Sequence, residues 1–395
     1  MYKELVTFKN LPLSNGLLST PNTKANGYDL KVGFDPKTCL VALYDNVSPE
    51  EMFNEDYVYD SSQSTTMIEH FKQAALSIQN KFECSRPLEI GSNSGIFIEH
   101  FSKDISLAVE PCDNFAKITA DENIRTYNEY WGDEVTDKII ESYGKRDMIF
   151  SANTISHIQN LDECFSNVYK CLSDDGVFII ESPSFLELLK GNAFDQFYHE
   201  HQSYFGCLSL NNLLKKHNLS IFNIELYPVH GGTYRFFITK DNHYPVSSNV
   251  EGALKEEIKY GLNNYEILKI RMGMMLDNIK EINRTLVDLK QEGANIIGYG
   301  ASAKFTQVTN MSEVDNNIID FVMDTTPDKQ NKYLPKSNIK ILPYSKELLK
   351  NVDYCFLGAW NYKKEIMDKE IEFLEAGGKF VTHIPTIQIY DISNR

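Results

Sequence analysis

The stretch LEIGSNSGIFIEHF, residues 88–101, decides the fold of this chain. It begins as a short apolar strand, turns at Gly91-Ser-Asn-Ser-Gly95, and continues with apolar residues at helical spacing. Glycine lets the backbone turn tightly and approach a ligand closely. A strand, a glycine turn and a helix in this order predict one unit of a parallel sheet with a ligand site at its edge.

Short apolar segments alternate with helical ones beyond this turn. The predicted strands are residues 87–91, 105–111, 147–153 and 176–183, with a closing pair at 219–229 and 232–240. After a helical stretch at 247–292, strands are predicted again at 294–300, 318–324, 352–358 and 379–385. Such alternation predicts parallel sheets that helices cover on both faces.

The N-terminal part has a different pattern. Residues 1–66 read as short strands and turns rich in Asn, Pro and Gly, and a helix begins at about Thr65. We therefore expect an α/β protein with a small lobe over 1–66, a doubly wound domain over 67–240 and a second one over 241–395. A chain of 395 residues is long enough for two or three domains.

Composition and charge argue against several classes of protein. A hydrophobic content of 42% with 24% charged residues is ordinary for a soluble globular protein. The net charge of −16 argues against a nucleic-acid or anionic-membrane partner, because both require a basic face. The N-terminus lacks the apolar core of a signal peptide, and no apolar run reaches the ~18 residues of a spanning helix. Seven scattered cysteines without a CxxC pair indicate reduced thiols and a cytoplasmic protein.

The first glycine turn carries the residue types of a nucleotide site. Glu89 closes the strand, Gly91 and Gly95 shape the turn around Asn93, and Glu110 ends the next predicted strand. An acidic side chain at that strand end can accept hydrogen bonds from both hydroxyls of a ribose. A dinucleotide fingerprint would read GxGxxG, whereas this turn has no third glycine. The form E-x-G-x-x-x-G with a following acid resembles the S-adenosylmethionine site of Rossmann-like methyltransferases. An ordinary tight turn is the alternative.

Two polar residues follow the predicted strand at 147–153. Asn153 and His157 lie at its carboxyl end, the edge along which open α/β sheets bind ligands. We assign Asn153 to the cofactor site. For His157, a packing role is the alternative to a place in the pocket.

The stretch FDQFYHEHQSYFG, residues 194–206, places two histidines, a glutamate and two tyrosines between phenylalanines. In a helix, His199 and His201 would point to sides about 200° apart, so helical metal ligation fits poorly. A loop could bring them together, and the apolar frame would exclude water from a proton-transfer group. A buried cluster without catalysis is one alternative, and a metal site built on His199, Glu200 and His201 is another.

Seven short motifs resemble the sugar C-methyltransferases that act on nucleotide-linked 4-keto-deoxysugars. The motifs are EDYVYDSS (55–62), EIGSNSG (89–95), ANTISHI (152–158), FYHEHQSYF (197–205), HGGTYRF (230–236), GYGASAK (298–304) and AWNY (359–362). The similarity covers nearly the whole chain. It implies a Rossmann-like domain at 67–240 that uses S-adenosylmethionine, and a second Rossmann-like domain at 241–395 that binds the sugar nucleotide, in deoxysugar biosynthesis.

The resemblance also implies roles for individual residues. His201 is the implied base, Tyr198 and Glu200 support it, and His157 and Tyr59 line the same pocket. The chemistry requires such groups, because a hydrogen beside a ketone is weakly acidic and its removal leaves an enolate. An imidazole can take that proton, a neighbouring carboxylate can fix its tautomer, and a tyrosine can donate to the oxygen.

The N-terminal lobe departs from the family. Members usually begin with a small zinc-binding lobe that holds four cysteines in CxxC pairs, whereas residues 1–66 contain Cys39 alone and no histidine. A structural zinc site needs about four thiolate or imidazole ligands. We therefore expect no zinc here and a lobe that survives through packing.

A second glycine turn, GYGASAK at 298–304, again joins a predicted strand to a helix. Its amide groups and Lys304 can hold a phosphate, and the resemblance implies that this lobe binds the nucleotide diphosphate of the substrate. The residues assigned to the substrate are His199, Arg235, Gly300 and Lys304, with a surface ion pair as the alternative for Arg235. A weak dinucleotide site with Asp324 as the ribose ligand is the alternative for the turn.

The leading hypothesis is a methyltransferase that deprotonates a nucleotide-linked 4-keto-deoxysugar beside the ketone and methylates that carbon, C3. O- or N-methylation of a related sugar needs no carbon acid and is the nearest alternative. A nicotinamide-dependent sugar-nucleotide oxidoreductase would use the second glycine turn. A sugar-nucleotide binding protein without catalysis is the remaining alternative, which the intact YHEH stretch disfavours.

Overall fold

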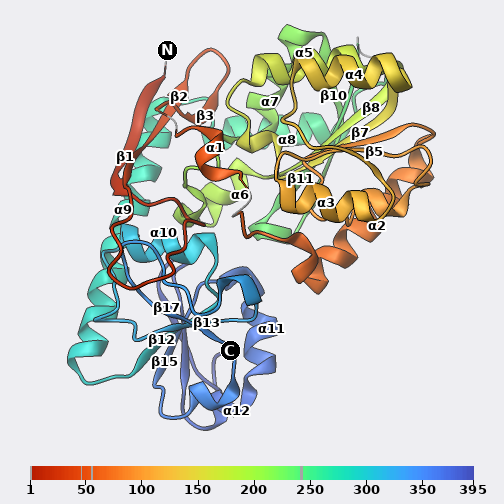
Figure 1. The fold of residues 1–395 in the computed structure, drawn as a ribbon. Coiled ribbons are helices and arrows are strands. Elements are labelled where there is room, and N and C mark those ends of the chain that lie inside the picture. The colour runs from red at the N-terminus through yellow and green to blue at the C-terminus, as the bar shows by residue number, and fades with distance from the viewer. Residues whose placement is uncertain (1, 46, 55–56, 241–242) are drawn as a thin grey trace.

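A computed structural model of the protein describes residues 2–45, 47–54, 57–240 and 243–395. Glu55 and Asp56, which begin the EDYVYDSS motif, and Asp241, at the expected domain boundary, lie outside the described residues. The described strands form a four-stranded, a seven-stranded and a six-stranded sheet, which Figure 1 shows as separate parts of the ribbon. The predicted α/β class is confirmed.

The four-stranded sheet is antiparallel and takes three of its strands from the N-terminal lobe. Its strands are β1 (Lys3–Leu11), β2 (Tyr28–Asp35), β3 (Leu40–Leu43) and β9 (Ser203–Tyr204), and the short helix α1 (Pro49–Met52) follows β3. Strand β9 comes from the 194–206 stretch, and its Tyr204 pairs with Val41 of β3. Backbone hydrogen bonds therefore tie the histidine-rich stretch to the N-terminal lobe, which the sequence pattern did not predict.

The seven-stranded sheet has the order β10-β11-β8-β7-β4-β5-β6. Its strands are β4 (Pro87–Ile90), β5 (Leu107–Val109), β6 (Arg125–Tyr127), β7 (Arg146–Ala152), β8 (Leu172–Pro183), β10 (Leu219–Tyr227) and β11 (Thr233–Lys240). Neighbours from β6 to β8 are parallel, while β11 and β10 are antiparallel. The short strand β6, Arg-Thr-Tyr, had no prediction because it lacks the apolar run that marks the equally short β5.

Helices cover both faces of this sheet. They are α2 (Thr65–Lys81), α3 (Asp113–Asp121), α4 (Asp133–Tyr143), α5 (Leu161–Cys171), α6 (Phe185–Lys190) and α7 (Cys207–Leu214). Apolar residues of α4, α5 and α7 pack on one face, and those of α2 pack on the other. Figure 1 shows α4 and α5 on the opposite side of the sheet from α2 and α3.

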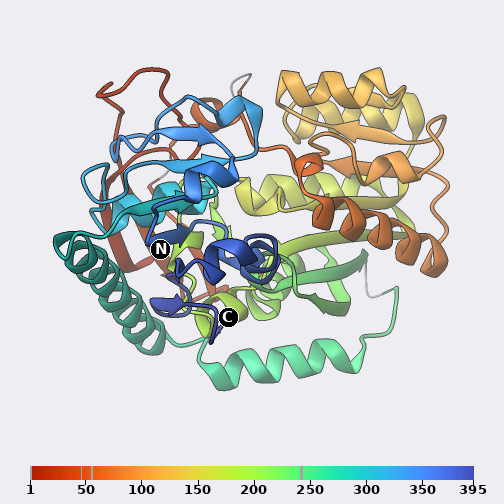
Figure 2. The same ribbon diagram turned by 90° about the horizontal axis from the view of Figure 1, so that it is seen from below.

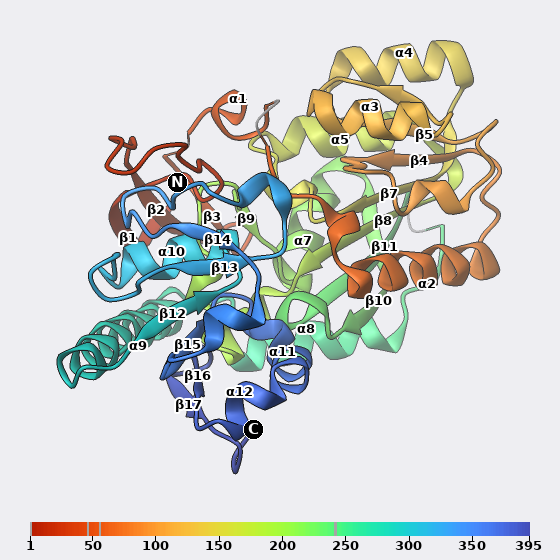
Figure 3. The same cartoon turned by 60° about the horizontal axis from the view of Figure 1, so that its bottom comes forward.

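The six-stranded sheet has the order β14-β13-β12-β15-β16-β17. Its strands are β12 (Ile296–Tyr299), β13 (Val322–Asp324), β14 (Ile341–Pro343), β15 (Tyr354–Leu357), β16 (Lys379–Thr382) and β17 (Gln388–Tyr390). The helices of this part are α9 (Tyr265–Gln291), α10 (Ala303–Met311), α11 (Lys363–Lys369) and α12 (Ile371–Glu375). Figure 3 shows α9 and α10 on one side of the sheet and α11 and α12 on the other.

The packing of the middle part continues beyond residue 240, where we expected its end. Helix α8 (Ser248–Tyr260) contacts α7 and β10 of the seven-stranded sheet, and its Val250 lies in that sheet's core. Glu257 of α8 accepts hydrogen bonds from the backbone amides of Cys207 and Leu208 at the start of α7. Figure 2 shows α8 below the seven-stranded sheet, and α9 beside the six-stranded one.

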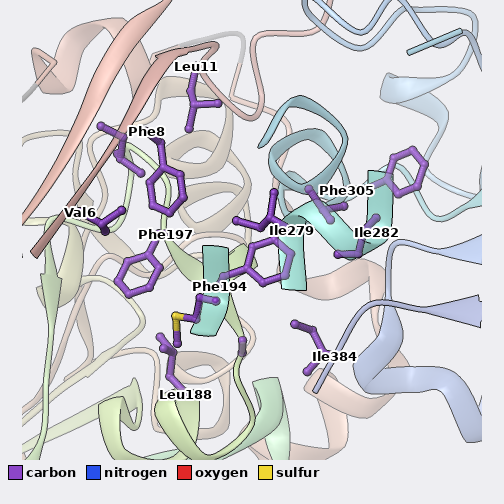
Figure 4. Close-up of a cluster of buried hydrophobic side chains, with 14 of the residues drawn as sticks. Val6, Phe8, Leu11, Leu188, Phe194, Phe197, Ile279, Ile282, Phe305 and Ile384 are labelled. Atoms are coloured by element: carbon purple, nitrogen blue, oxygen red, sulfur yellow. The ribbon is translucent and has the colours of Figure 1, made fainter. Parts of the chain in front are cut away.

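An apolar cluster joins the N-terminal lobe to the other two parts (Figure 4). Phe8 of β1 packs against Phe197, with ring centroids 6.4 Å apart, and both belong to one cluster with Ile282 of α9 and Phe305 of α10. Burial of large apolar side chains contributes roughly 1.5–3 kcal/mol each. The lobe is thus packed into the core shared with its neighbours.

Among the residues that the structure describes, no group of three or more His, Cys, Asp or Glu side chains is arranged to hold a metal ion. All seven cysteines carry free thiols. None of the helices in the described ranges is both long and apolar enough to cross a membrane. The absence of zinc and the cytoplasmic location stay predictions.

Candidate active site

The carboxyl ends of both parallel sheets contribute to one cavity of about 440 Å³. Asn153 and His157 follow β7 on one side, while Gly300 and Lys304 follow β12 on the other. The histidine-rich stretch adds His201 to the cavity wall, together with Tyr198 and Glu200. Open α/β sheets bind ligands at the carboxyl ends of their strands. Two such edges meet in this cavity, which can therefore hold two ligands.

His201 is held at both ring nitrogens. Its Nδ1 lies 2.9 Å from the carbonyl oxygen of Gln196, and its Nε2 lies 2.7 Å from the hydroxyl oxygen of Tyr198. A carbonyl only accepts, so Nδ1 carries the hydrogen and the lone pair of Nε2 accepts from the tyrosine hydroxyl. Burial and the neighbouring His157 hold the pKa of His201 well below its usual value, so the ring is neutral at pH 7.

The surroundings of His201 are aromatic. Its ring is stacked on that of His157 with centroids 5.2 Å apart, and His157 is stacked on Phe53 at 5.3 Å. Burial lowers the pKa of His157 to about 4. Burial, followed by the charge of Glu200, raises the pKa of Tyr198 well above its usual value, so Tyr198 stays a hydroxyl donor at neutral pH.

Glu200 does not orient the histidine in the way we expected. It is 4% exposed, and its Oε1 accepts a hydrogen bond from Asn15 Nδ2 at 2.7 Å. Its Oε2 accepts from the hydroxyl of Tyr57 at 3.2 Å. Burial raises the pKa of this carboxyl to about 7, although both donors oppose the rise. The group that fixes the tautomer of His201 is the Gln196 carbonyl, which a pattern of side chains cannot reveal.

His199 points away from its neighbour. Its ring packs edge-on against Tyr28 of β2, with centroids 5.9 Å apart, and the side chain is 2% exposed. Residues 198–201 form a turn in which the His201 amide donates to the Tyr198 carbonyl at 3.0 Å, and across this turn His199 packs against the N-terminal lobe while His201 lines the cavity. This placement gives no support to substrate binding by His199 or to a metal site that uses both histidines.

The carboxylate of Glu110 holds the first glycine turn in place. Glu110 accepts hydrogen bonds from the backbone amides of Asn93 and Cys112 at 2.7 and 2.9 Å, and burial raises its pKa. Gly91 has φ +71°, and a Cβ there would lie 2.1 Å from the hydroxyl of Thr154. Glycine is therefore required on both conformational and steric grounds. Glu89, also buried, accepts from the amide of Ile98 and fixes the segment that follows the turn.

A segment of the EDYVYDSS motif lies over this turn. The Asn93 side chain donates to the Tyr59 carbonyl at 2.9 Å and accepts from the Ser61 amide at 3.0 Å. The Ser94 hydroxyl donates to Asp60 at 2.9 Å. Tyr59 itself lines the cavity, as we expected, and is 41% exposed. The segment joins the first glycine turn to the cavity wall.

The residues around the first turn fit S-adenosylmethionine. Within the described chain, Ser92 Oγ and Asn153 Oδ1 are buried without a hydrogen-bond partner, and both lie beside this turn at the sheet edge. Buried polar atoms are normally paired, so two unpaired ones here indicate a polar ligand. Each oxygen of Glu110 has accepted one amide hydrogen, which leaves a lone pair for a ribose hydroxyl.

The second glycine turn opens directly into the cavity. Gly300 has φ +86°, and Ser302 caps helix α10, whose first turn contains Lys304. Lys304 Nζ is buried 5.3 Å from the ring centroid of Trp360, with no hydrogen-bond partner within the described residues. Burial lowers its pKa. A helix N-terminus and an unpaired ammonium group together favour an anion.

Arg235 is not placed to bind a phosphate. It lies within β11, is 1% exposed, and donates from Nε to Glu181 at 2.6 Å. Its guanidinium group also donates to the hydroxyl of Tyr227 and covers that ring at 4.2 Å. Glu181 in turn bonds His70 at 2.7 Å. The expected substrate contact is therefore a buried ion pair that holds two strands and α2 together.

Asn15, Tyr57 and His230 are among the residues of the cavity wall that sequence reasoning missed. Asn15 had no signal, because its partner Glu200 is 185 positions away in the chain. Tyr57 stands in the same motif as Tyr59 and could have been chosen with it. His230 stands in the HGGTYRF motif, and its Nε2 is buried without a hydrogen-bond partner in the described structure.

The comparisons with known proteins fit this architecture. A family profile described as "Methyltransferase domain" matches residues 59–223, which include the seven-stranded sheet up to β10. A second profile, "C-methyltransferase C-terminal domain", matches residues 228–385. The fold, the first glycine turn and these matches define an S-adenosylmethionine-dependent methyltransferase.

A full-length relative defines the family. The C-methyltransferase NovU of Streptomyces niveus is 30% identical over 393 residues, which cover 97% of this chain and 93% of that protein. The chain therefore belongs to the C-methyltransferase family of which NovU is a member.

Two solved structures each resemble about half of the chain. The CcbJ methyltransferase of Streptomyces caelestis is 10% identical, covers 52% of this chain and 99% of that chain, and has a TM-score of 0.35. An S-adenosylmethionine-dependent methyltransferase of Clostridium acetobutylicum is 13% identical, covers 44% and 90%, and has a TM-score of 0.33. At such scores these likenesses carry no argument.

Proposed function

We propose that this methyltransferase deprotonates a nucleotide-linked 4-keto-deoxysugar at the carbon beside the ketone, C3, and methylates that carbon. One observation carries the proposal: a neutral, tyrosine-bonded imidazole and a buried unpaired lysine line the same cavity. The imidazole suits a carbon acid, and the lysine suits a phosphate.

His201 acts as the base in this proposal. Its Nδ1 hydrogen is engaged by the Gln196 carbonyl, so the electron pair that can accept the proton is on Nε2. Because the pKa of His201 lies well below its usual value, the ring is in its basic form throughout the neutral range. The Gln196 carbonyl also stabilises the imidazolium that forms, since it accepts from Nδ1 in both states.

Tyr198 supplies the hydrogen bond that the substrate oxygen needs. Its hydroxyl now donates to Nε2 of His201 at 2.7 Å. A ketone oxygen beside it can accept this hydrogen instead, which frees Nε2 to take the proton from the neighbouring carbon. Negative charge then grows on the oxygen next to the donor, where removing one comparable donor costs about 10²–10³ in rate in other enzymes.

The two glycine turns divide the ligands between them. S-adenosylmethionine, when bound, supplies an electrophilic methyl group on its sulfonium. The first turn binds it through Glu110 and Asn153, and the second turn holds the diphosphate through Lys304 and the α10 N-terminus. Asn153 and Lys304 both line the cavity that His201 lines, so the two ligands can meet beside this base.

Solvent exchange tests the proposal on the wild-type enzyme. A 4-ketosugar nucleotide incubated in deuterated water, with S-adenosylhomocysteine in the donor site, should gain deuterium at C3. With S-adenosylmethionine the same carbon should gain the methyl group. Methylation of an oxygen or a nitrogen without any exchange would contradict the proposal and favour the O- or N-methyltransferase.

A further inference from the structure

The cavity contains a residue of the N-terminal lobe. Asn15 lies in the loop between β1 and β2, lines the cavity, and donates from Nδ2 to Glu200 Oε1 at 2.7 Å. Tyr57 donates to the other oxygen of the same carboxyl at 3.2 Å. Both oxygens of a buried carboxyl are thus held by donors from outside the histidine-rich stretch, and both donors belong to residues 1–66, the lobe that lacks the family's zinc ligands.

The loop that contains Asn15 is fixed at both sides. Ser14, 2% exposed, accepts a hydrogen bond from Gln307 Nε2 of α10 at 2.7 Å, and Gln307 also donates to the carbonyl of Pro12. On the other side, Leu18 and Tyr333 exchange two backbone hydrogen bonds of 2.9 and 2.8 Å. The loop is therefore pinned to the six-stranded part while its tip holds Glu200, so the orientation of the asparagine is set in advance.

We propose that Asn15 is a positioning residue through which the N-terminal lobe completes the active site: it holds the Glu200 carboxyl at the cavity wall and favours its ionised form. The proposal rests on the proposed function only for the identity of the substrate. It gives the lobe a role that needs no metal, because packing and backbone hydrogen bonds place the loop.

The chemistry follows from the donors. An amide N–H next to a carboxyl stabilises the carboxylate, whereas burial stabilises the protonated acid. The other titratable groups that face Glu200 are Tyr57, Tyr198, Cys112 and Lys329. Of these, only Lys329 is a cation that lowers the pKa of the carboxyl by its charge. Loss of the Asn15 amide should therefore move the titration of Glu200 to higher pH.

Direct titration tests the contact without any substrate. In protein labelled with ¹³C at the glutamate carboxyls, the Glu200 signal is assigned by its loss in Glu200→Gln and followed against pH. Asn15→Ala should raise the midpoint by about half a unit to one unit. Asn15→Asp has nearly the same shape and adds a negative charge, so it should raise the midpoint further. Asn26→Ala, in an exposed part of the same loop, should leave it unchanged.

The pH profile of kcat/KM tests the positioning role. The limb of this profile near pH 7 should move to higher pH in Asn15→Ala and Asn15→Asp, whichever protonation state of Glu200 the reaction uses. The limb should vanish in Glu200→Gln. Asn15→Gln, which keeps an amide donor, should return the limb toward wild type. A Glu200 midpoint that is the same in wild type, Asn15→Ala and Asn15→Asp overturns the proposal. A shifted midpoint in an enzyme that does not turn over 4-ketosugar nucleotides supports the Asn15 contact and overturns the proposed substrate instead.

Discussion

At the end of β5 in the seven-stranded sheet, Glu110 accepts the backbone amides of Asn93 and Cys112. At the end of β13 in the six-stranded sheet, Asp324 accepts those of Ala301 and Thr326, both at 2.7 Å. In each sheet an acid ties the glycine turn of the neighbouring strand to its own strand end. The two turns are built alike because a strand, a glycine and an acid at fixed places satisfy the same backbone donors.

The two turns differ in what lies over them. The first is bonded to residues 59–61 through the side chain of Asn93, whereas the second opens to the cavity with Lys304 in its first helical turn. Among the described residues, the first turn has buried oxygens without a hydrogen-bond partner beside it, and the second has an ammonium group without one. Similar local folds therefore offer different ligand chemistry, since the neighbours of a turn decide its polarity.

The largest effect on activity is expected at His201, which lines the cavity and belongs to neither glycine turn. His201→Asn keeps a similar polar shape but cannot accept a proton at neutral pH. Exchange at C3 and methylation should both fall by about 10²–10⁴, while calorimetry should show nearly unchanged binding of both ligands. If methylation stays within a few-fold of wild type, proton removal belongs to another group, and His157, whose ring is stacked on His201, becomes the candidate.

The next test compares the two acids at the strand ends, Glu110 and Asp324. Glu110→Ala should weaken S-adenosylmethionine binding by roughly 1.5–3 kcal/mol for each charged hydrogen bond lost. Asp324→Ala is the matched control, because it removes the equivalent acid from the other sheet and should leave that affinity nearly unchanged. If calorimetry shows the reverse order of losses, the methyl donor binds to the six-stranded part.

Lys304 tests the second turn separately. Lys304→Ala should weaken binding of a nucleoside diphosphate by on the order of 1–2 kcal/mol, and the difference from wild type should grow at low salt. Lys340→Ala removes a cation from the same part of the chain at an exposed place and serves as the control. Loss of S-adenosylmethionine binding in Lys304→Ala would show that the two turns are assigned the wrong way round.

A smaller effect is expected where residues 59–61 lie over the first glycine turn. Ser94→Ala removes the hydroxyl that donates to Asp60 at 2.9 Å. One neutral donor is worth about 0.5–1.5 kcal/mol, more when its acceptor is charged. Amides of residues 57–63 should exchange faster with deuterated water, while those of α10 stay as in wild type. Unchanged exchange at 57–63 would mean that the segment is held by its other contacts.

No effect is expected from a chelator. The N-terminal lobe packs through Phe8 and Phe197 into the shared core, so EDTA should leave the unfolding temperature unchanged. Elemental analysis of the purified protein should find no zinc in proportion to the chain. Phe8→Ala, by contrast, should cost about 3–5 kcal/mol in unfolding free energy, because it opens a cavity in this core. One bound zinc per chain would contradict the expectation.

Much of the fold was predictable because periodicity is a local property. The strand and turn at 87–95, the helix from Thr65 and the second strand-and-turn at 294–300 all agree with the structure. Strands β6, β14 and β17 were missed, whereas the equally short β5 and β13 were predicted because each lies in a longer run of apolar residues. Helix α8, beyond the expected boundary at residue 240, packs onto α7 and β10, and no local signal in the sequence shows where a helix will pack.

The sequence by itself determined the class of fold, the two glycine turns, their acids and the presence of a histidine, a tyrosine and a glutamate in one short stretch. Only the tertiary structure decided how those side chains are used. It placed the Gln196 carbonyl where it fixes the tautomer of His201, and it paired Glu200 with Asn15. It also packed His199 against Tyr28 and paired Arg235 with Glu181. The physical reason is that a glycine turn is built from residues close in sequence, whereas the pairing of a buried polar group depends on whatever donor the rest of the chain brings within about 3 Å.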